Sequence, residues 1–133
     1  MRVFYVDTSA AMKLLREEEE TPALIRWQKK LSPKSHQAVS SDILRTELML
    51  AGTRWGVSAT EIRRVVNALT TLRVTGNICD SAGRLSGLGL RSLDALHLAS
   101  ALTLEQSLQA VVTYDKRMVH AAQQLGLPTV SPA

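Results

Sequence analysis

The chain has 133 residues, of which 45% are hydrophobic, and this suits a single domain spanning residues 1–133. Its formal net charge of +4 and sequence pI near 9.6 suit a polyanionic partner but do not establish one. No apolar run approaches the ~20 residues of a membrane span, and no signal peptide is visible, so we expect a cytoplasmic protein with no membrane partner. One cysteine, Cys79, excludes an intrachain disulfide and a cysteine-based zinc site, and we expect it to be buried.

In chain order, the sequence predicts short strands that alternate with amphipathic helices. The expected elements of the first half are a strand at 3–6, a helix from Thr8 or Ser9 to about Leu15, a helix beginning at Thr21-Pro22, a weak strand at 38–40, a helix at 42–55 and a helix behind the capping box 58–61. The acidic run 17–20 is expected to be a solvated turn.

The second half continues the alternation. Its expected elements are a strand at 73–79, a short helix at 80–85, a helix at 93–105 that is apolar nearly all round and therefore buried, a strand at 110–113, a helix capped by Asp115 and a last strand at 127–130. Strands separated by helices predict an α/β layer fold with a mainly parallel sheet.

Four acidic residues fall at positions that such a fold brings to one edge of its sheet. Asp7 directly follows the first strand, and Asp115 lies two residues beyond the strand at 110–113. Asp94 lies in the first turn of the buried helix, and Glu47 interrupts an apolar helix face. Ligand sites of open α/β sheets lie beyond the carboxyl ends of the strands, which is where these acids are expected.

Each acid also has a simpler explanation when it is taken alone. Asp7 and Asp115 suit helix caps, Asp94 complements a helix dipole, and Glu47 suits a pair with an arginine or a solvent-facing position. Four clustered carboxylates, however, repel one another, and protonation or a bound cation relieves the repulsion. An all-oxygen site of this kind predicts Mg²⁺, with Mn²⁺ as the alternative.

Four segments carry a resemblance to a known family. VFYVDTSAAMKLL, SSDILRTELMLA, RSLDALHLASAL and AVVTYDKRM resemble, in order and spacing, the four motifs of PIN-domain ribonucleases, and the length resembles VapC-type toxins of bacterial toxin–antitoxin pairs. The resemblance implies a three-layer α/β/α fold with a sheet of four to five short strands. It also implies that Asp7, Glu47, Asp94 and Asp115 are catalytic and hold Mg²⁺ or Mn²⁺ for hydrolysis of RNA.

The resemblance also assigns finer roles. Asp7 and Asp94 are expected to be the most direct metal ligands, with Glu47 and Asp115 acting through water. Thr113 matches the Ser/Thr that precedes the fourth acid by two residues. Attack by water would leave a 5′-phosphate and a 3′-hydroxyl. Thr8 and Ser9 are expected to orient a metal-bound water, to cap the following helix, or both.

The implied partners are an RNA substrate (transfer or ribosomal RNA), a VapB-type antitoxin and a second copy of the chain in a homodimer. The antitoxin is expected to lie as a helix in an apolar groove around Trp27, Leu31, Leu48 and Trp55.

Other interpretations remain open at this point. A receiver-like signalling domain with a phospho-accepting Asp, and a non-catalytic PIN-like module that binds RNA or a partner, are the alternatives. A D-x-D phosphatase would need an acid where Ser9 stands.

For His97, a histidine that packs and hydrogen-bonds locally is favoured over a metal ligand. The charges of Lys13, Arg16, Lys116 and Arg117 lie near the expected site edge, where solvation is a simpler role than RNA contact.

Overall fold

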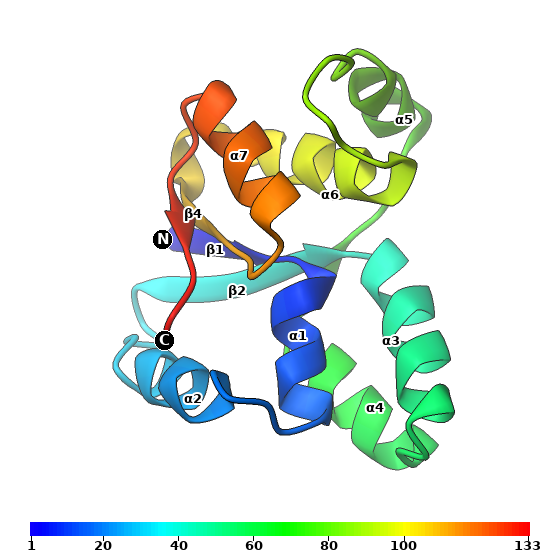
Figure 1. Ribbon diagram of the computed structural model, residues 1–133. Helices are drawn as coiled ribbons and strands as arrows, with labels where there is room; N and C mark the ends of the chain where they lie inside the picture. The colour runs from blue at the N-terminus through cyan, green and yellow to red at the C-terminus, as the bar shows by residue number, and fades with distance from the viewer.

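A computed structural model describes residues 1–133, and its centre is one five-stranded sheet (Figure 1). The strands are β1 (Arg2–Val6), β2 (His36–Ser41), β3 (Thr70–Leu72), β4 (Leu108–Val112) and β5 (Thr129–Val130). Their order across the sheet is β3-β2-β1-β4-β5, and every neighbouring pair is parallel. The predicted α/β fold with a parallel sheet is therefore confirmed, and all strands end at the same edge.

Helices cover both faces of the sheet. They are α1 (Thr8–Leu15), α2 (Thr21–Lys29), α3 (Ile43–Arg54), α4 (Ala59–Asn67), α5 (Gly76–Gly83), α6 (Ser92–Leu102) and α7 (Lys116–Gln124). Figure 1 shows α1 to α4 on one side of the sheet and α5 to α7 on the other. The predicted three-layer α/β/α arrangement is confirmed. None of these helices has the length and apolar character that crossing a membrane requires.

The alternation of side chains along β1 divides the core in two. Phe4 and Val6 point to one face, where they pack in a cluster with residues of α1 to α4. Val3 and Tyr5 point to the other face and pack with residues of α6 and α7, including Leu98. A strand buried on both faces reads as a continuous apolar run, which explains the sequence of residues 3–6.

The prediction of a strand at 73–79 is wrong. The third strand lies earlier, at Thr70–Leu72, and Thr75 instead caps α5 by accepting a hydrogen bond from the backbone N–H of Ile78. The expected helix at 80–85 is the second half of α5. Cys79 is exposed and not buried as predicted, because Ile78 and Ala82 are the α5 residues that pack towards α6.

The buried helix is shorter than the sequence predicts. It ends at Leu102, and a separate 3-10 turn covers Glu105–Ser107. Its second half is buried as expected, but Leu93 in its first turn is 47% exposed. The first turn of α6 therefore faces solvent, at the same end of the helix as Asp94.

Candidate active site

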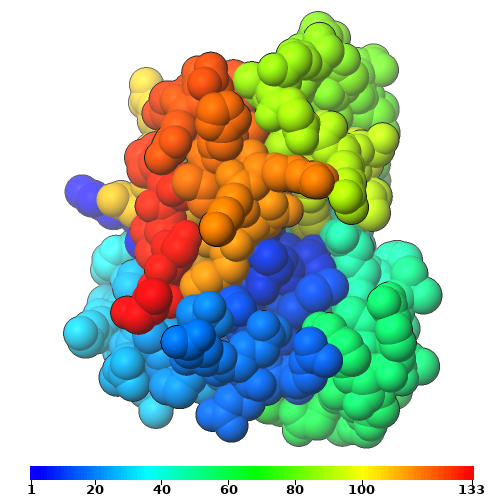
Figure 2. All heavy atoms as spheres, in the orientation of Figure 1, coloured from blue at the N-terminus to red at the C-terminus, as the bar shows by residue number.

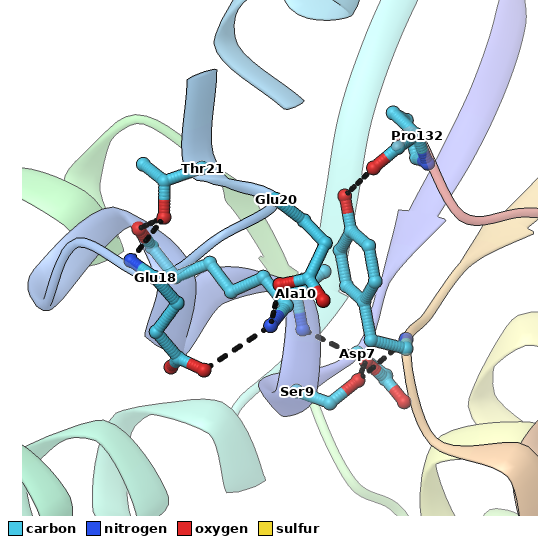
Figure 3. A network of polar contacts seen from close by, with 9 residues as sticks. Asp7, Ser9, Ala10, Glu18, Glu20, Thr21 and Pro132 are labelled. Carbon is cyan, nitrogen blue, oxygen red and sulfur yellow. Dashed lines mark hydrogen bonds and ion pairs between the residues drawn. The ribbon is translucent and has the colours of Figure 1, made fainter. Parts of the chain in front are cut away.

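Asp7 is a buried helix cap at the carboxyl end of β1. Its Oδ1 accepts hydrogen bonds from Ser9 Oγ at 2.6 Å and from the Ala10 backbone N–H at 3.2 Å (Figure 3), and Oδ2 accepts one from Thr113 Oγ1 at 2.6 Å. The residue is 4% exposed. Burial raises the pKa of Asp7, and the bonds from Ser9 and Thr113 oppose that rise.

This geometry changes two expectations from the sequence. Asp7 itself is the N-cap of α1, so the assignment of the cap to Thr8 or Ser9 is wrong. A carboxylate that is almost without solvent exposure and has hydrogen bonds on both oxygens is also poorly placed to accept a phosphoryl group. The receiver-like alternative therefore finds no support at Asp7.

The loop after β4 is tied to Asp7 by two hydroxyl groups. Ser9 Oγ accepts a hydrogen bond from the Tyr114 backbone N–H at 2.9 Å, and Thr113 Oγ1 accepts one from the Asp115 backbone N–H at 3.1 Å. Asp115 then begins α7 by accepting a bond from the Arg117 backbone N–H, as the sequence predicts. Ser9 and Thr113 thus place the loop that carries Asp115.

Glu47 projects from α3 towards α1 and α6. Its Oε1 lies 2.7 Å from Thr8 Oγ1, which donates a hydrogen bond, and 2.7 Å from His97 Nε2. Burial disfavours the charged carboxylate, but these two hydrogen bonds and the nearby imidazole outweigh burial and lower the pKa of Glu47. The suggested pairing of Glu47 with an arginine is wrong, since Arg45 instead pairs with Asp42.

Three of the four acids line one pocket of about 500 Å³. Glu47, Asp94 and Asp115 surround it together with Arg91, Ser92, Leu93 and Arg117. In Figure 2, the start of α7 (orange) extends towards the yellow-green segment that leads into α6. Burial, followed by the negative charges of Asp115 and Glu47, raises the pKa of Asp94. The pocket is therefore one in which carboxylates repel each other.

Asp7 is not among the residues that line this pocket. No three carboxylate, imidazole or thiol groups in the protein lie close enough together to form a metal-binding cluster. The structure thus brings Glu47, Asp94 and Asp115 around one cavity, while it encloses Asp7 among hydroxyl and amide donors behind the loop. Direct metal contact by Asp7, which the family resemblance implies, stays a prediction: Oδ1 accepts two hydrogen bonds, whereas Oδ2 accepts only the one from Thr113 and keeps a further acceptor position.

Tyr5 and His97 make contacts beside the site that the sequence does not predict. His97 was expected to bond locally, yet its Nδ1 lies 2.7 Å from the hydroxyl of Tyr5 on β1, and its Nε2 reaches Glu47 on α3. The available signals were a histidine inside an otherwise apolar helix and a tyrosine inside a buried strand. Each side chain has a polar group, and buried polar groups in proteins are almost always hydrogen-bonded.

Lys13 also departs from the expectation of a solvated charge at the site edge. It is 7% exposed, and its Nζ pairs with Glu18 at 3.2 Å and Glu20 at 2.8 Å (Figure 3). The ammonium lies 4.6 Å from the centre of the Tyr114 ring, whose hydroxyl donates to the Pro132 carbonyl. The acidic run is therefore partly engaged with Lys13, not only a solvated turn.

Arg16 and Arg117 have different surroundings. The guanidinium of Arg16 lies 3.9 Å above the ring of Trp55, so it packs on α3's C-terminal end. Arg117 and Arg91 line the pocket of Glu47, Asp94 and Asp115, hereafter the acidic pocket.

Comparison with known proteins agrees with this fold. The PIN domain family matches residues 4–124. Ribonuclease VapC46 of Mycobacterium tuberculosis is 40% identical over 134 residues and covers 100% of both chains. The chain therefore belongs to the PIN-domain family and, within it, to the VapC-type ribonucleases.

Solved structures resemble the fold at lower identity. Mycobacterium tuberculosis VapC20, described as a toxin that cleaves the sarcin–ricin loop, has a TM-score of 0.73 at 16% identity, over 97% of this chain and 99% of that one. A toxin–antitoxin complex from Klebsiella pneumoniae has a TM-score of 0.70 at 17% identity, over 100% of this chain and 98% of that one. These likenesses confirm the PIN fold predicted from the sequence.

Proposed function

We propose that the protein is a Mg²⁺-dependent endoribonuclease that acts as the toxin of a VapBC-type toxin–antitoxin pair. The observation that carries this proposal is the pocket in which Glu47, Asp94 and Asp115, from three separate elements, face Arg91 and Arg117. Carboxylates suit a divalent cation, and arginines suit the phosphates of RNA. Residues 1–133 would act as a single PIN domain.

The donor chemistry of the pocket fits Mg²⁺ or Mn²⁺. All three acids offer oxygen, the ligand that these hard cations prefer, and a cation would relieve the repulsion that raises the pKa of Asp94. Mg²⁺ keeps several water ligands, so it does not need the closed cluster that this structure lacks. We propose Glu47, Asp94 and Asp115 as the residues that face the cation, with Asp7 as the fourth catalytic acid.

A divalent cation in this pocket would acidify water and neutralise charge that develops on the scissile phosphate. The chain's own residues would do the positioning. Arg91 and Arg117 would bind phosphate oxygens beside the acids. Asp7 would act mainly by fixing Ser9 and Thr113, which hold the loop before Asp115. Attack by water would give a 5′-phosphate and a 3′-hydroxyl.

The partner proposals rest on the family and on a second, apolar hollow. Of the four residues expected to form the groove, Trp27 and Leu31 line a hollow of about 160 Å³ beside α2 together with Phe4 and Val6, whereas Leu48 is fully buried and Trp55 packs against Arg16. A helical segment of a VapB-type antitoxin suits such a surface, and the likeness to a toxin–antitoxin complex supports this choice. Transfer or ribosomal RNA as substrate and a homodimeric state stay predictions, which cleavage-site sequencing and light scattering would test.

One assay tests the enzymatic proposal. Purified antitoxin-free protein is incubated with total RNA in Mg²⁺ or in EDTA, beside Asp94→Asn and Glu47→Gln. Cleavage is expected only for the native protein in Mg²⁺, with 5′-phosphate ends. Glu61→Gln is the matched control, because Glu61 is an exposed acid on α4 that pairs with Arg64. RNA cleavage that persists in EDTA or in both acid variants contradicts the proposal.

A further inference from the structure

We propose that His97, held by Tyr5, is a positioning residue that fixes Glu47 so that a single carboxylate oxygen faces the acidic pocket. This inference rests on the proposed function of that pocket. His97 would not touch substrate or cation itself. Its role would be to remove the rotational freedom of Glu47 before either arrives.

The three side chains form one chain of contacts across three elements. Tyr5 on β1 is fully buried, and His97 on α6 is 2% exposed. The Tyr5 hydroxyl lies 2.7 Å from His97 Nδ1, and His97 Nε2 lies 2.7 Å from Glu47 Oε1. Both ring nitrogens are therefore used, and the imidazole has no second orientation that would keep both partners.

The partners also define the direction of the hydrogen bonds. An ionised carboxylate only accepts hydrogen bonds, so His97 Nε2 must carry the proton that it shares with Glu47. In a neutral imidazole Nδ1 is then an acceptor, and the Tyr5 hydroxyl is its donor. Tyr5 thereby selects the tautomer that Glu47 requires.

The two carboxylate oxygens of Glu47 differ in their hydrogen-bond partners. Oε1 receives the bonds from both Thr8 and His97, whereas Oε2 has no hydrogen-bond partner within the protein. Since Glu47 lines the acidic pocket, Oε2 is the oxygen left for a cation or its water. Partners that orient a metal ligand typically change metal affinity or activity by about 10–100-fold.

The position of His97 in the helix explains how this arrangement is built. His97 follows Asp94 by three residues, so the two occupy neighbouring turns on the same side of α6. Asp94 then faces the pocket from the exposed first turn, while His97 lies one turn deeper. One helix thus supplies an acid to the pocket and positions another acid that α3 supplies.

The first experiment measures Mn²⁺ binding by calorimetry or by electron paramagnetic resonance, without RNA. We expect His97→Leu to weaken Mn²⁺ binding by about 10-fold or more, and His97→Gln, whose amide can donate from near the Nε2 position, to restore most of it. Leu98→Val is the matched control, because Leu98 is an equally buried neighbour on α6 that packs in the apolar cluster and has no polar group to lose. Equal Mn²⁺ affinity for His97→Leu and the native protein overturns the inference.

A double-variant test separates positioning from general damage. In a Glu47→Ala background, His97→Leu is expected to weaken Mn²⁺ binding no further, because the residue it orients is absent. An additional loss of similar size in that background would mean that His97 acts by another route, which also overturns the inference.

The second experiment needs no metal. Nitrogen NMR of the His97 ring in metal-free protein should show a proton on Nε2, and Tyr5→Phe should reduce the preference for that tautomer. A native ring without a proton on Nε2 overturns the inference. If the native protein binds no Mn²⁺, the proposed function fails, while this tautomer measurement still decides the arrangement of Tyr5, His97 and Glu47.

Discussion

Thr113 Oγ1 donates a 2.6 Å hydrogen bond to Asp7 Oδ2, which joins two residues that lie 106 positions apart in the chain. Asp7 directly follows β1 and Thr113 directly follows β4, two strands that are neighbours in the sheet. The bond therefore connects the first and last acidic motifs directly. Because Thr113 also accepts from the Asp115 backbone N–H, the state of Asp7 is coupled to the loop that carries Asp115.

Replacing Thr113 with valine should expose this coupling. The shape is retained, but a buried carboxylate oxygen loses its donor, which is expected to cost about 1–3 kcal/mol of unfolding free energy. Chemical denaturation in EDTA would measure the loss. Thr70→Val, at an exposed position of β3, should change stability by less than about 0.5 kcal/mol. Equal stabilities for the two variants would argue against an essential Thr113 bond.

The contribution of Asp7 to the stability of the metal-free protein should be less favourable at neutral pH than in acid. Burial raises the pKa of Asp7 above its ordinary value of 3.8, so the folded chain binds this proton more tightly than the unfolded chain. The stabilising contribution of protonation is fully present below pH ~3.8 and is lost as the pH rises through the folded-state pKa.

Asp7→Asn should therefore raise the melting temperature at pH 7 in EDTA, while it abolishes RNA cleavage. The gain should shrink as the pH falls through the raised folded-state pKa of Asp7, below which the native carboxyl is protonated as well. Thermal unfolding followed by circular dichroism between pH 4 and 8 would measure both trends. Asp80→Asn, at an exposed site of α5, is the control and should show neither. A lower melting temperature for Asp7→Asn at pH 7 would contradict this account.

Local patterns were sufficient for much of the fold. The apolar run at residues 3–6 predicted β1, and the alternation of strands with helices predicted the parallel sheet. The boundary between β3 and α5 was not predicted, because Val74 and Ile78 suggest a strand as readily as a helix. Thr75, whose side chain caps α5, was the overlooked signal.

The candidate site was only partly predictable, for a different reason. The places of the four acids relative to the predicted strands and helices predicted that they lie near one sheet edge, and Glu47, Asp94 and Asp115 line one pocket. The enclosure of Asp7 and the partners of His97 depend on contacts between residues far apart in sequence, such as the 92 positions between Tyr5 and His97. No local pattern encodes such contacts, so a histidine in an apolar helix was assigned the more ordinary local role.

Lys13→Met should loosen the segment between α1 and α2. The change removes charge-assisted bonds to Glu18 and Glu20 and the contact with the Tyr114 ring, and we expect a loss of about 1–2 kcal/mol. Limited proteolysis should show earlier cleavage near residues 17–20. Lys30→Met, at an exposed position after α2, should leave both stability and the cleavage pattern unchanged. A Lys13→Met protein with native protease resistance would contradict the view that Lys13 holds the segment between α1 and α2 in place.

Gly52→Ala should destabilise the protein through the contact between α3 and α4. A Cβ atom at Gly52 would lie 2.6 Å from Ile62 Cδ1, which is closer than real side-chain atoms approach, and Ile62 is itself buried. Overpacking of this kind is expected to cost about 1–3 kcal/mol in chemical denaturation, and Ile62→Val in the same chain should recover part of it. Gly83→Ala is the matched control, because a Cβ there meets nothing within 4 Å, and its stability should equal or exceed that of the native protein. Equal effects of the two alanines would mean that α3 and α4 separate at little cost, contrary to the close packing of Gly52 on Ile62.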